Sequence, residues 1–369
     1  MQPRDRVLMA LRRQEPDRVP YDLQGFNREA ERLFREKTGS DDPWAYFGAE
    51  RMTENIYFKG TKLDLKDRFL HYHDLPEENF VLWHDGLPVS GTFTLSEWGL
   101  AAVVGSNPAY DVFTPPLKDV NTLADVETFP MPDFEDGYRH AHLPDAVAAA
   151  KAKGVAPVGR MAVTIFETAW HIRGFNELLM DFVERPDWAN CLLDRITEKS
   201  CFRAACYARA GCDCIHIGDD VGKEDRLIMS PATWRNYLKP RLAKVIAAGR
   251  AVKPDILFDY HSDGTVEPLI EDFIEIGIDS LNPVQPECMD PAKLKRQFGA
   301  RLSFWGTIGI QHTMPFGSPA DVEAEVKLRC DSMKQGGGLF LAPTHVLAPE
   351  VPHDNIRAFV DAAKKYGGY

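Results

Sequence analysis

The chain has 369 residues, of which 44% are hydrophobic and 27% are charged, a length that allows one large α/β barrel or two ordinary domains. Its formal net charge of −12 disfavours nucleic-acid binding through neutralised phosphates, and no run of about 18 apolar residues is present to span a membrane. The seven cysteines have no repeating spacing, so a disulfide framework is not expected.

The N-terminal region is predicted to contain two helices and one short strand. The first helix covers residues 4–12 and lacks the apolar centre of a signal peptide, so we expect a cytoplasmic protein. Residues 16–20 (PDRVP) end this helix and lead into a strand over residues 19–23. A second helix is predicted over residues 27–37 and stops at Gly39.

An irregular insert follows over about residues 41–132. Turn pairs between residues 85 and 88 separate short extended pieces, and residues 91–104 have the pattern of a β-hairpin. Long inserts of this kind in compact domains are more often functional lids or walls than structureless loops. We therefore expect the insert to contribute to the rim of a site.

From about residue 143 the chain alternates helices with short apolar strands. After the strand that ends at residue 161, the next helix is predicted to begin near residue 176, and one continuous helix is predicted over residues 231–248. The predicted strands cover residues 155–161, 214–217, 256–260, 280–284, 302–305 and 339–341. Such strands, apolar on both faces and separated by helices, indicate a parallel sheet covered on both sides. Residues 19–23 supply a seventh strand, and the insert has room for an eighth.

This pattern predicts a single domain over residues 1–369. The fold class is α/β, a (β/α)8 TIM-type barrel with an N-terminal helical and hairpin excursion. An open doubly wound sheet is disfavoured because no glycine-rich turn of the dinucleotide-binding type follows the first strand.

Polar side chains follow most of the predicted strands at their carboxyl ends, the edge at which α/β barrels carry their active sites. These residues are Glu167, Asp219, Asp220, His261, Asp263, Gln285, Glu287, Cys288, Trp305 and His345. We expect them to face one bowl-shaped site for a small molecule. Of the adjacent carboxylates Asp219 and Asp220, one is expected to accept backbone N–H groups while the other faces substrate, although both could cap helices.

His261, Cys288 and His345 form a set of two nitrogen ligands and one sulfur ligand. Three protein ligands with one open position are typical of catalytic zinc, and a thiolate favours zinc over magnesium or calcium. The alternative is a metal-free site in which both histidines are hydrogen-bonded and Cys288 is an inert thiol.

Aromatic side chains suit the walls of this bowl. Phe93 and Trp98 come from the insert, and Trp305 follows a strand. With Gln285 they form the predicted substrate-binding set for a flat or apolar compound. Core packing explains the aromatic residues nearly as well.

Several segments together resemble the uroporphyrinogen decarboxylase superfamily, which implies a (β/α)8 barrel. The matching segments are residues 4–11 (RDRVLMAL), 16–20 (PDRVP), 219–220 (DD), 229–231 (MSP), 260–264 (YHSDG), 281–285 (LNPVQ) and 336–345 (GGGLFLAPTH). True uroporphyrinogen decarboxylases carry an Arg-Gln-Ala-Gly-Arg-Tyr segment after the first strand that holds substrate carboxylates. Here residues 24–29 read QGFNRE, which favours another branch.

That branch contains zinc-dependent methyltransferases that work with corrinoid proteins. His261 matches the histidine of its His-x-Cys motif, while Asp263 stands at the position of the first cysteine and His345 at that of the last. The resemblance implies Zn²⁺, for which we predict His261, Cys288 and His345 as ligands. It also implies a cobalamin-type corrinoid supplied by a partner protein, because the chain lacks an Asp-x-His-x-x-Gly pattern.

The leading functional hypothesis is O-demethylation of a small methoxylated compound, with the methyl group passing to cob(I)alamin on the partner. Asp219, Asp263 and Glu167 are the predicted catalytic residues, which orient the substrate or supply a proton. One alternative is metal-free decarboxylation with Asp219 stabilising a protonated ring. Another is a barrel that binds a ligand without turnover, and a homodimer is compatible with the sequence.

Overall fold

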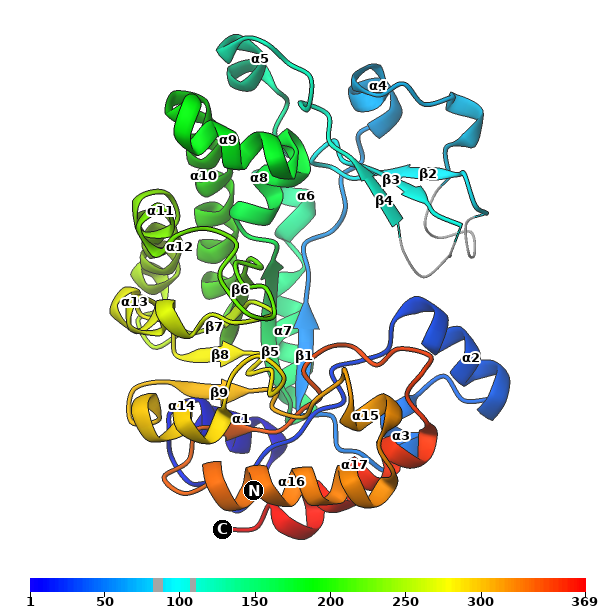
Figure 1. Ribbon diagram of the computed structural model, residues 1–369, viewed down its shortest axis with the longest axis vertical. Coiled ribbons are helices and arrows are strands. Elements are labelled where there is room, and N and C mark those ends of the chain that lie inside the picture. The colour runs from blue at the N-terminus through cyan, green and yellow to red at the C-terminus, as the bar shows by residue number, and fades with distance from the viewer. Residues whose placement is uncertain (82–88, 107–110) are drawn as a thin grey trace.

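The structure is a computed structural model that describes residues 1–81, 89–106 and 111–369 (Figure 1). The turn pairs predicted between residues 85 and 88 lie outside this part of the chain. Among the described residues, no helix is both long enough and apolar enough to cross a membrane.

A parallel sheet of seven strands forms the centre of the molecule, in the order β1-β5-β6-β7-β8-β9-β10 (Figure 1). The strands are β1 (Thr53–Ile56), β5 (Ala156–Ala162), β6 (Cys214–Gly218), β7 (Leu257–His261), β8 (Ser280–Asn282), β9 (Ser303–Trp305) and β10 (Leu339–Phe340). All six strands predicted after residue 154 are present. β1 is the further strand for which the sequence leaves room in the irregular insert.

Residues 19–23 close this sheet between β10 and β1. Tyr21 forms a parallel bridge with Leu341, and the Asp22 amide donates to the Leu341 carbonyl at 2.9 Å. On the other side, the Thr53 hydroxyl of β1 donates to the Asp22 carboxylate at 3.1 Å. The predicted strand is thus an extended segment with a single bridge, and the predicted α/β fold with a TIM-type barrel is confirmed.

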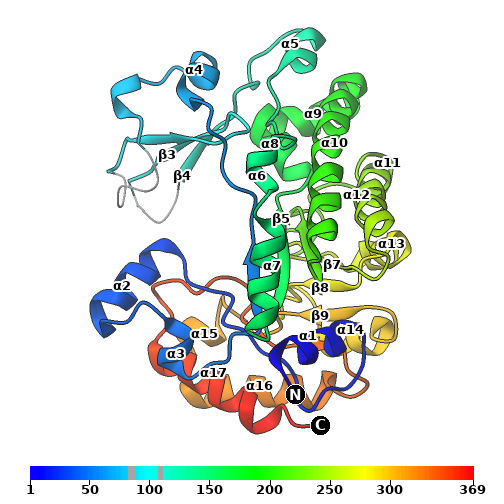
Figure 2. The same cartoon turned by 180° about the vertical axis from the view of Figure 1, so that it is seen from behind.

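Helices cover the outside of the barrel (Figures 1 and 2). In the repeating part they are α7 (Leu143–Ala152), α8 (Phe166–Arg173), α9 (Phe175–Glu184), α10 (Pro186–Ala210), α11 (Pro231–Tyr237), α12 (Lys239–Val252), α13 (Ile270–Ile276), α14 (Pro291–Phe298), α15 (Thr313–Phe316), α16 (Pro319–Met333) and α17 (His353–Tyr366). The helices earlier in the chain are α1 (Pro3–Leu11), α2 (Arg28–Thr38), α3 (Pro43–Phe47), α4 (Leu65–Phe69), α5 (Leu123–Thr128) and α6 (Gly137–His140), of which α4 and α5 lie in the insert. Short 3₁₀ helices are η1 (Leu70–Tyr72), η2 (Glu77–Asn79) and η3 (Glu267–Leu269).

Two helical segments differ from the sequence-based expectation. α8 occupies residues that the sequence pattern leaves outside any helix. The single helix predicted over residues 231–248 is divided at Leu238 into α11 and α12. Pro240 lies in the first turn of α12 and has no N–H group, so the hydrogen-bond ladder of α11 cannot continue through it.

α1 packs against the amino-terminal end of the barrel. Its buried face includes Val7, Ala10 and Leu11. Inside the barrel, the Ser303 hydroxyl of β9 donates to the carbonyls of Ala10 at 3.2 Å and Leu11 at 3.0 Å. The site must therefore lie at the opposite end, where the carboxyl ends of the strands are.

The insert forms a separate antiparallel sheet of β2 (Phe93–Leu95), β3 (Ala101–Val104) and β4 (Asp111–Thr114), beyond the arrowhead of β1 (Figure 1). The predicted hairpin is present as β2 and β3. Phe93 is fully buried and packs against Phe80, and the half-buried Trp98 packs against Phe134. These two aromatic residues contribute to the packing of the insert, so their contact with substrate stays a prediction.

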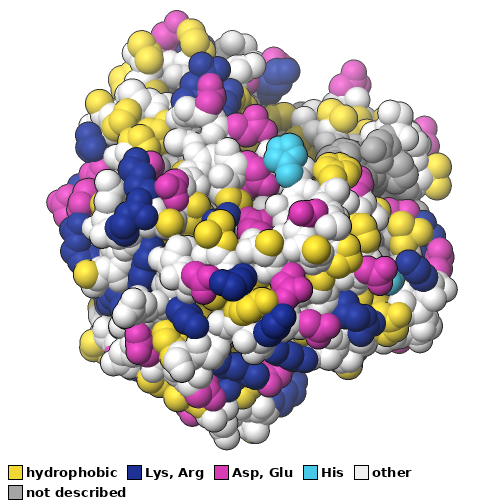
Figure 3. All heavy atoms as spheres, turned by 60° about the horizontal axis from the view of Figure 1, so that its bottom comes forward, with side chains coloured by type: hydrophobic (Ala, Val, Ile, Leu, Met, Phe, Trp, Pro, Cys, Tyr) yellow, Lys and Arg dark blue, Asp and Glu magenta, His cyan; other side chains and the backbone are white. Residues whose placement is uncertain are grey.

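Charged side chains of both signs are interspersed on the face shown in Figure 3. Apolar side chains lie scattered between them. Although the net charge is −12, the acidic residues on this face are mixed with basic ones and do not form one acidic patch.

Candidate metal and proton-transfer site

Three side chains at the carboxyl ends of neighbouring strands form a tight cluster. Asp220 follows β6, His261 ends β7, and Asp263 lies two residues further on. One ligand atom from each of the three lies within 4.8 Å of the other two. Each side chain keeps partial contact with solvent, so the cluster lies at the surface of the bowl.

The orientation of His261 is fixed by its neighbour on β8. The Asn282 side-chain nitrogen donates to the Trp305 carbonyl at 3.3 Å, which directs Asn282 Oδ1 toward the imidazole. His261 Nδ1 lies 2.7 Å from that oxygen, so Nδ1 carries the proton. The lone pair of Nε2 is then free to bind a cation.

The space in front of His261 Nε2 fits a cation. Nε2 lies 3.8 Å from Asp220 Oδ1 and 4.0 Å from Asp263 Oδ1. Both separations are too long for a hydrogen bond. One imidazole nitrogen and two carboxylate oxygens are a donor set that zinc accepts. The residues present therefore fit the metal that the sequence predicts.

The backbone brings these groups together by a close approach of β6 and β7. Gly218 has a φ of 148°, and a Cβ at this position would lie 2.2 Å from the His261 carbonyl oxygen. Only glycine avoids that clash. The Asp263 amide donates to Asp220 Oδ1 at 2.8 Å, which holds the two carboxylate-bearing loops together.

Asp219 has a different position from its neighbour. Its fully buried carboxylate accepts the amides of Ile165 at 2.9 Å and Glu167 at 3.0 Å, at the start of α8. Burial raises its pKa. Of the two adjacent aspartates, Asp219 thus caps a helix and Asp220 faces the site. A catalytic role for Asp219 stays a prediction, with positioning of α8 as its visible task.

Glu167 lies in the first turn of α8 beside these carboxylates. Its Oε2 accepts the amide of Asp220 at 3.0 Å. Burial, followed by the charges of Asp220 and Asp219, raises the pKa of Glu167 to about 9. This side chain therefore carries a proton at neutral pH, as a general acid must.

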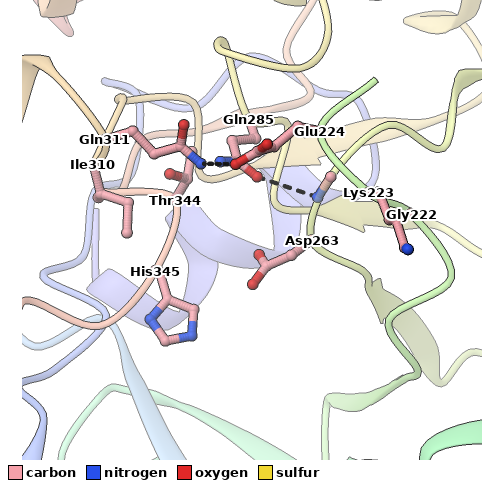
Figure 4. A pocket seen from close by; sticks show the side chains of 10 residues that line it. Gly222, Lys223, Glu224, Asp263, Gln285, Ile310, Gln311, Thr344 and His345 are labelled. Carbon is pink, nitrogen blue, oxygen red and sulfur yellow. Dashed lines mark hydrogen bonds between the residues drawn. The ribbon is translucent and has the colours of Figure 1, made fainter. Parts of the chain in front are cut away.

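A cavity of about 420 Å³ opens beside the cluster (Figure 4). It is lined by Gly222, Lys223, Glu224, Asp263, Gly264, Gln285, Ile310, Gln311, Thr344 and His345. Figure 4 shows Asp263 and His345 across an open space from each other. Gln285 Oε1 accepts the Gly264 amide at 3.1 Å, which fixes the side chain at the cavity wall.

The predicted ligands divide between the cluster and its surroundings. His261 lies in it, whereas Cys288 and His345 do not, within the part of the chain that the structure describes. His345 lines the adjoining cavity. Burial, then the charge of Glu287, raises the pKa of Cys288 to about 11, so this thiol holds its proton. Ligation by Cys288 and His345 stays a prediction.

Trp305 lies deeper than the predicted bowl wall. It is 4% exposed and its ring stacks on Phe340 at 4.5 Å. It does not belong to the residues lining the cavity. Its contact with substrate stays a prediction.

Sequence reasoning missed a buried pair beneath His261. His216 Nδ1 lies 2.6 Å from Asp259 Oδ2, and both residues are buried inside the barrel. Burial lowers the pKa of His216 and raises that of Asp259 to about 7. The available signal was polar residues in otherwise apolar strands, CIHIG and LFDYH.

The fold and the site define a (β/α)8 barrel with a carboxylate–imidazole centre at the carboxyl edge of its sheet. The chain belongs to the uroporphyrinogen decarboxylase (URO-D) family, whose model matches residues 109–366.

A methyltransferase and a uroporphyrinogen decarboxylase are both among the relatives of this chain. A methylcobamide:CoM methyltransferase MtaA from Methanosarcina barkeri is 32% identical over 184 residues, 50% of this chain and 51% of the relative. This chain thus spans about half the length of that methyltransferase. A uroporphyrinogen decarboxylase from Pseudomonas fluorescens is 24% identical over 278 residues, 72% of each chain. A solved methyltransferase from Methanosarcina mazei shares the fold, with a TM-score of 0.66, 23% identity and 99% coverage of both chains.

Proposed function

We propose that this protein is a zinc-dependent methyltransferase that works with a separate corrinoid protein and removes the methyl group of a small methoxylated compound. The similarity to a methylcobamide:CoM methyltransferase supports methyl transfer over half of the chain. The observation that carries the proposal is the convergence of His261 Nε2 on two carboxylate oxygens, which lie 3.8 Å and 4.0 Å away.

His261, Asp220 and Asp263 would hold the metal. This ligand set keeps His261 from the predicted set and has Asp220 and Asp263 in place of Cys288 and His345. His345 lies across the cavity from Asp263 and is the candidate for a further ligand or a substrate contact (Figure 4). When bound, zinc would supply Lewis acidity at the ether oxygen of the substrate. A nitrogen and oxygen donor set makes this centre harder than a thiolate site, which agrees with an oxygen-containing substrate.

Glu167 would supply the proton that the reaction consumes. Cleavage of an O–CH₃ bond leaves its electron pair on oxygen, and the leaving group becomes an alcohol only after protonation. The acceptor of the methyl group would be the cob(I)alamin of the partner. Burial is the first cause of the raised pKa of Glu167, and it favours the protonated form that can supply this proton.

Gln285 would position the substrate at the cavity wall. Since its Oε1 already accepts the Gly264 amide, its amide nitrogen remains available as a donor to a polar group of the substrate. Asp219 would act indirectly, because its bonds to the start of α8 place Glu167 next to Asp220.

The test combines metal analysis with single substitutions. We expect purified protein to contain about one zinc per chain. His261→Ala and Asp263→Ala should remove most of that zinc. Cys288→Ala separates the two ligand sets, because it leaves zinc content unchanged if Asp220 and Asp263 are ligands. Purified protein that binds no zinc and gives no methyl transfer from methoxylated compounds to cob(I)alamin would refute the proposal.

Metal-free decarboxylation is the second candidate, supported by the relatives named uroporphyrinogen decarboxylase. The cavity offers little to a substrate with many carboxylates, since Lys223 is the one lysine or arginine among the described residues that line it. Release of CO₂ from uroporphyrinogen would favour this candidate. Binding of a methoxylated compound without turnover, in the presence of reduced corrinoid, would instead favour a non-catalytic barrel.

A further inference from the structure

The interior of this barrel contains a row of polar residues at one level. Neighbouring strands pair Arg160 with His216, His216 with Asp259, and Asp259 with Ser280. Interiors of such barrels are usually filled with Val, Ile and Leu. His216 and Asp259 are 3% and 0% exposed. The chain thus keeps a costly polar pair where apolar packing is the rule.

The pair lies directly beneath the metal cluster. Gly218 and His261 are paired one level closer to the carboxyl ends of the same two neighbouring strands, β6 and β7. The rings of His216 and His261 lie 5.6 Å apart between centroids at an angle of 48°. His216 is therefore in contact with the imidazole whose Nε2 faces the two carboxylates.

His216 is itself held on two sides. Its Nδ1 is 2.6 Å from Asp259 Oδ2, and its ring packs edge-on against Trp305 at 6.1 Å. Trp305 stacks on Phe340 of β10 and is fixed in turn. Asn282 restrains one edge of the His261 ring, and the immobilised His216 ring forms a wall beside it.

We propose that His216 and Asp259 form a positioning unit that holds the His261 ring in the orientation in which Nε2 faces Asp220 and Asp263. The metal-binding part of this inference rests on the proposed function. Neither residue of the pair contacts substrate. The hydrogen bond to Asp259 fixes the orientation of the His216 ring, and the His216 ring in turn restricts the rotation of His261.

The test uses substitutions that either keep or break the hydrogen bond between His216 and Asp259. Asp259→Asn retains a side-chain oxygen for His216, whereas Asp259→Leu and His216→Phe replace the polar atoms by apolar ones and break the bond. We expect zinc affinity, measured by competition with a chromophoric chelator, to fall about 10- to 100-fold for the two breaking variants. Asp259→Asn should stay within about threefold of the parent, and the double variant His216→Phe/Asp259→Leu should bind no more weakly than the weaker single one.

Ser303→Ala is the matched control. Ser303 pairs with Ser280 in the same row but lies two strands away from β7, and its hydroxyl donates to the carbonyls of Ala10 and Leu11 in α1. We expect this substitution to lower stability and leave zinc affinity unchanged. Equal losses of affinity in Ser303→Ala and His216→Phe would overturn the inference, as would parental affinity in both breaking variants.

A second measurement does not depend on the metal. In chelator-treated protein with ¹⁵N-labelled histidine, the parent should show a single Nδ1–H tautomer for His261, assigned by its loss in His261→Gln. His216→Phe should give an averaged or broadened signal, and Asp259→Asn should retain the parental one. An unchanged His261 signal in folded His216→Phe overturns the inference. Parent protein without zinc affinity would refute the proposed function alone, because this measurement still decides the positioning role.

Discussion

Replacement of Glu167 by glutamine tests the proton that the proposed reaction requires. Burial and the neighbouring carboxylates raise the pKa of this side chain from 4.5 to about 9. The folded protein therefore keeps a proton that the unfolded chain releases above pH 4.5. It follows that the free energy of unfolding falls as the pH rises from 4.5 through about 9.

The size of the effect follows from the pH interval. Each pH unit above the unfolded pKa removes about 1.4 kcal/mol from the stability. Between the ordinary pKa of 4.5 and pH 7 the upper limit is about 3 kcal/mol. Glutamine has the same shape, has no charge to suppress, and can still accept the Asp220 amide through its oxygen. Glu167→Gln should therefore be more stable than the parent by up to that amount at pH 7, and equal to it near pH 4.5.

The assay is urea unfolding of chelator-treated protein at pH 5, 6, 7 and 8. Glu50→Gln is the control with the opposite sign: burial acts to raise the pKa of Glu50, but its ion pairs with Arg18 and Arg6 outweigh burial and lower that pKa. That variant should lose stability at neutral pH, and the loss should vanish as the pH falls through the range where Glu50 is protonated. Methyl transfer by Glu167→Gln should drop about 10²- to 10⁴-fold. If the unfolding free energy of Glu167→Gln shows the parental pH slope, Glu167 is not held protonated and the general-acid role is refuted.

Three further substitutions probe the frame around the site. Gly218→Ala should lower the melting temperature and zinc content together, because its Cβ would lie 2.2 Å from the His261 carbonyl oxygen; unchanged values for both would contradict the close approach of β6 and β7. Asn282→Ala should reduce zinc affinity about 10- to 100-fold, since His261 Nδ1 loses its partner, and titration with a metal chelator checks it. Arg173→Met should cost about 3–5 kcal/mol in urea unfolding, because it removes the partner at 2.7 Å of the buried Asp181 carboxylate and leaves it only the longer ion pair with Arg185 at 3.6 Å among the described residues. A loss below about 1 kcal/mol would show that the carboxylate finds other partners.

The sequence predicted the repeating half of the fold because hydrophobic period and length are local properties. Strands such as β6 and β7 have apolar runs bounded by turn residues, and β5 to β10 all appear where those runs lie. The sequence pattern did not predict α8, because the start of this helix is defined by the Asp219 carboxylate, more than 50 residues away along the chain. Bonds of that range leave no local period to detect.

The candidate site was predicted in its location and only partly in its members. The carboxyl edge of the sheet and His261 followed from strand order. The choice of metal ligands could not be predicted in this way. The sequence does not show which of Asp219 and Asp220 faces the site, or how far Cys288 lies from the His261 imidazole. The spacing between side chains depends on backbone details such as the contact at Gly218.

The way in which residues 19–23 close the barrel has a consequence for local opening of the fold. Within the described residues, no backbone hydrogen bond joins this segment to β1. The contact is made by the Asp22 carboxylate, which accepts the Thr53 hydroxyl of β1 and the Trp44 indole N–H of α3. Amide groups along this junction should exchange their hydrogens for deuterium before those of the β5–β6–β7 ladder do. Native-state hydrogen exchange should therefore separate the molecule into a slow half centred on β6 and a faster flank formed by the two ends of the barrel wall.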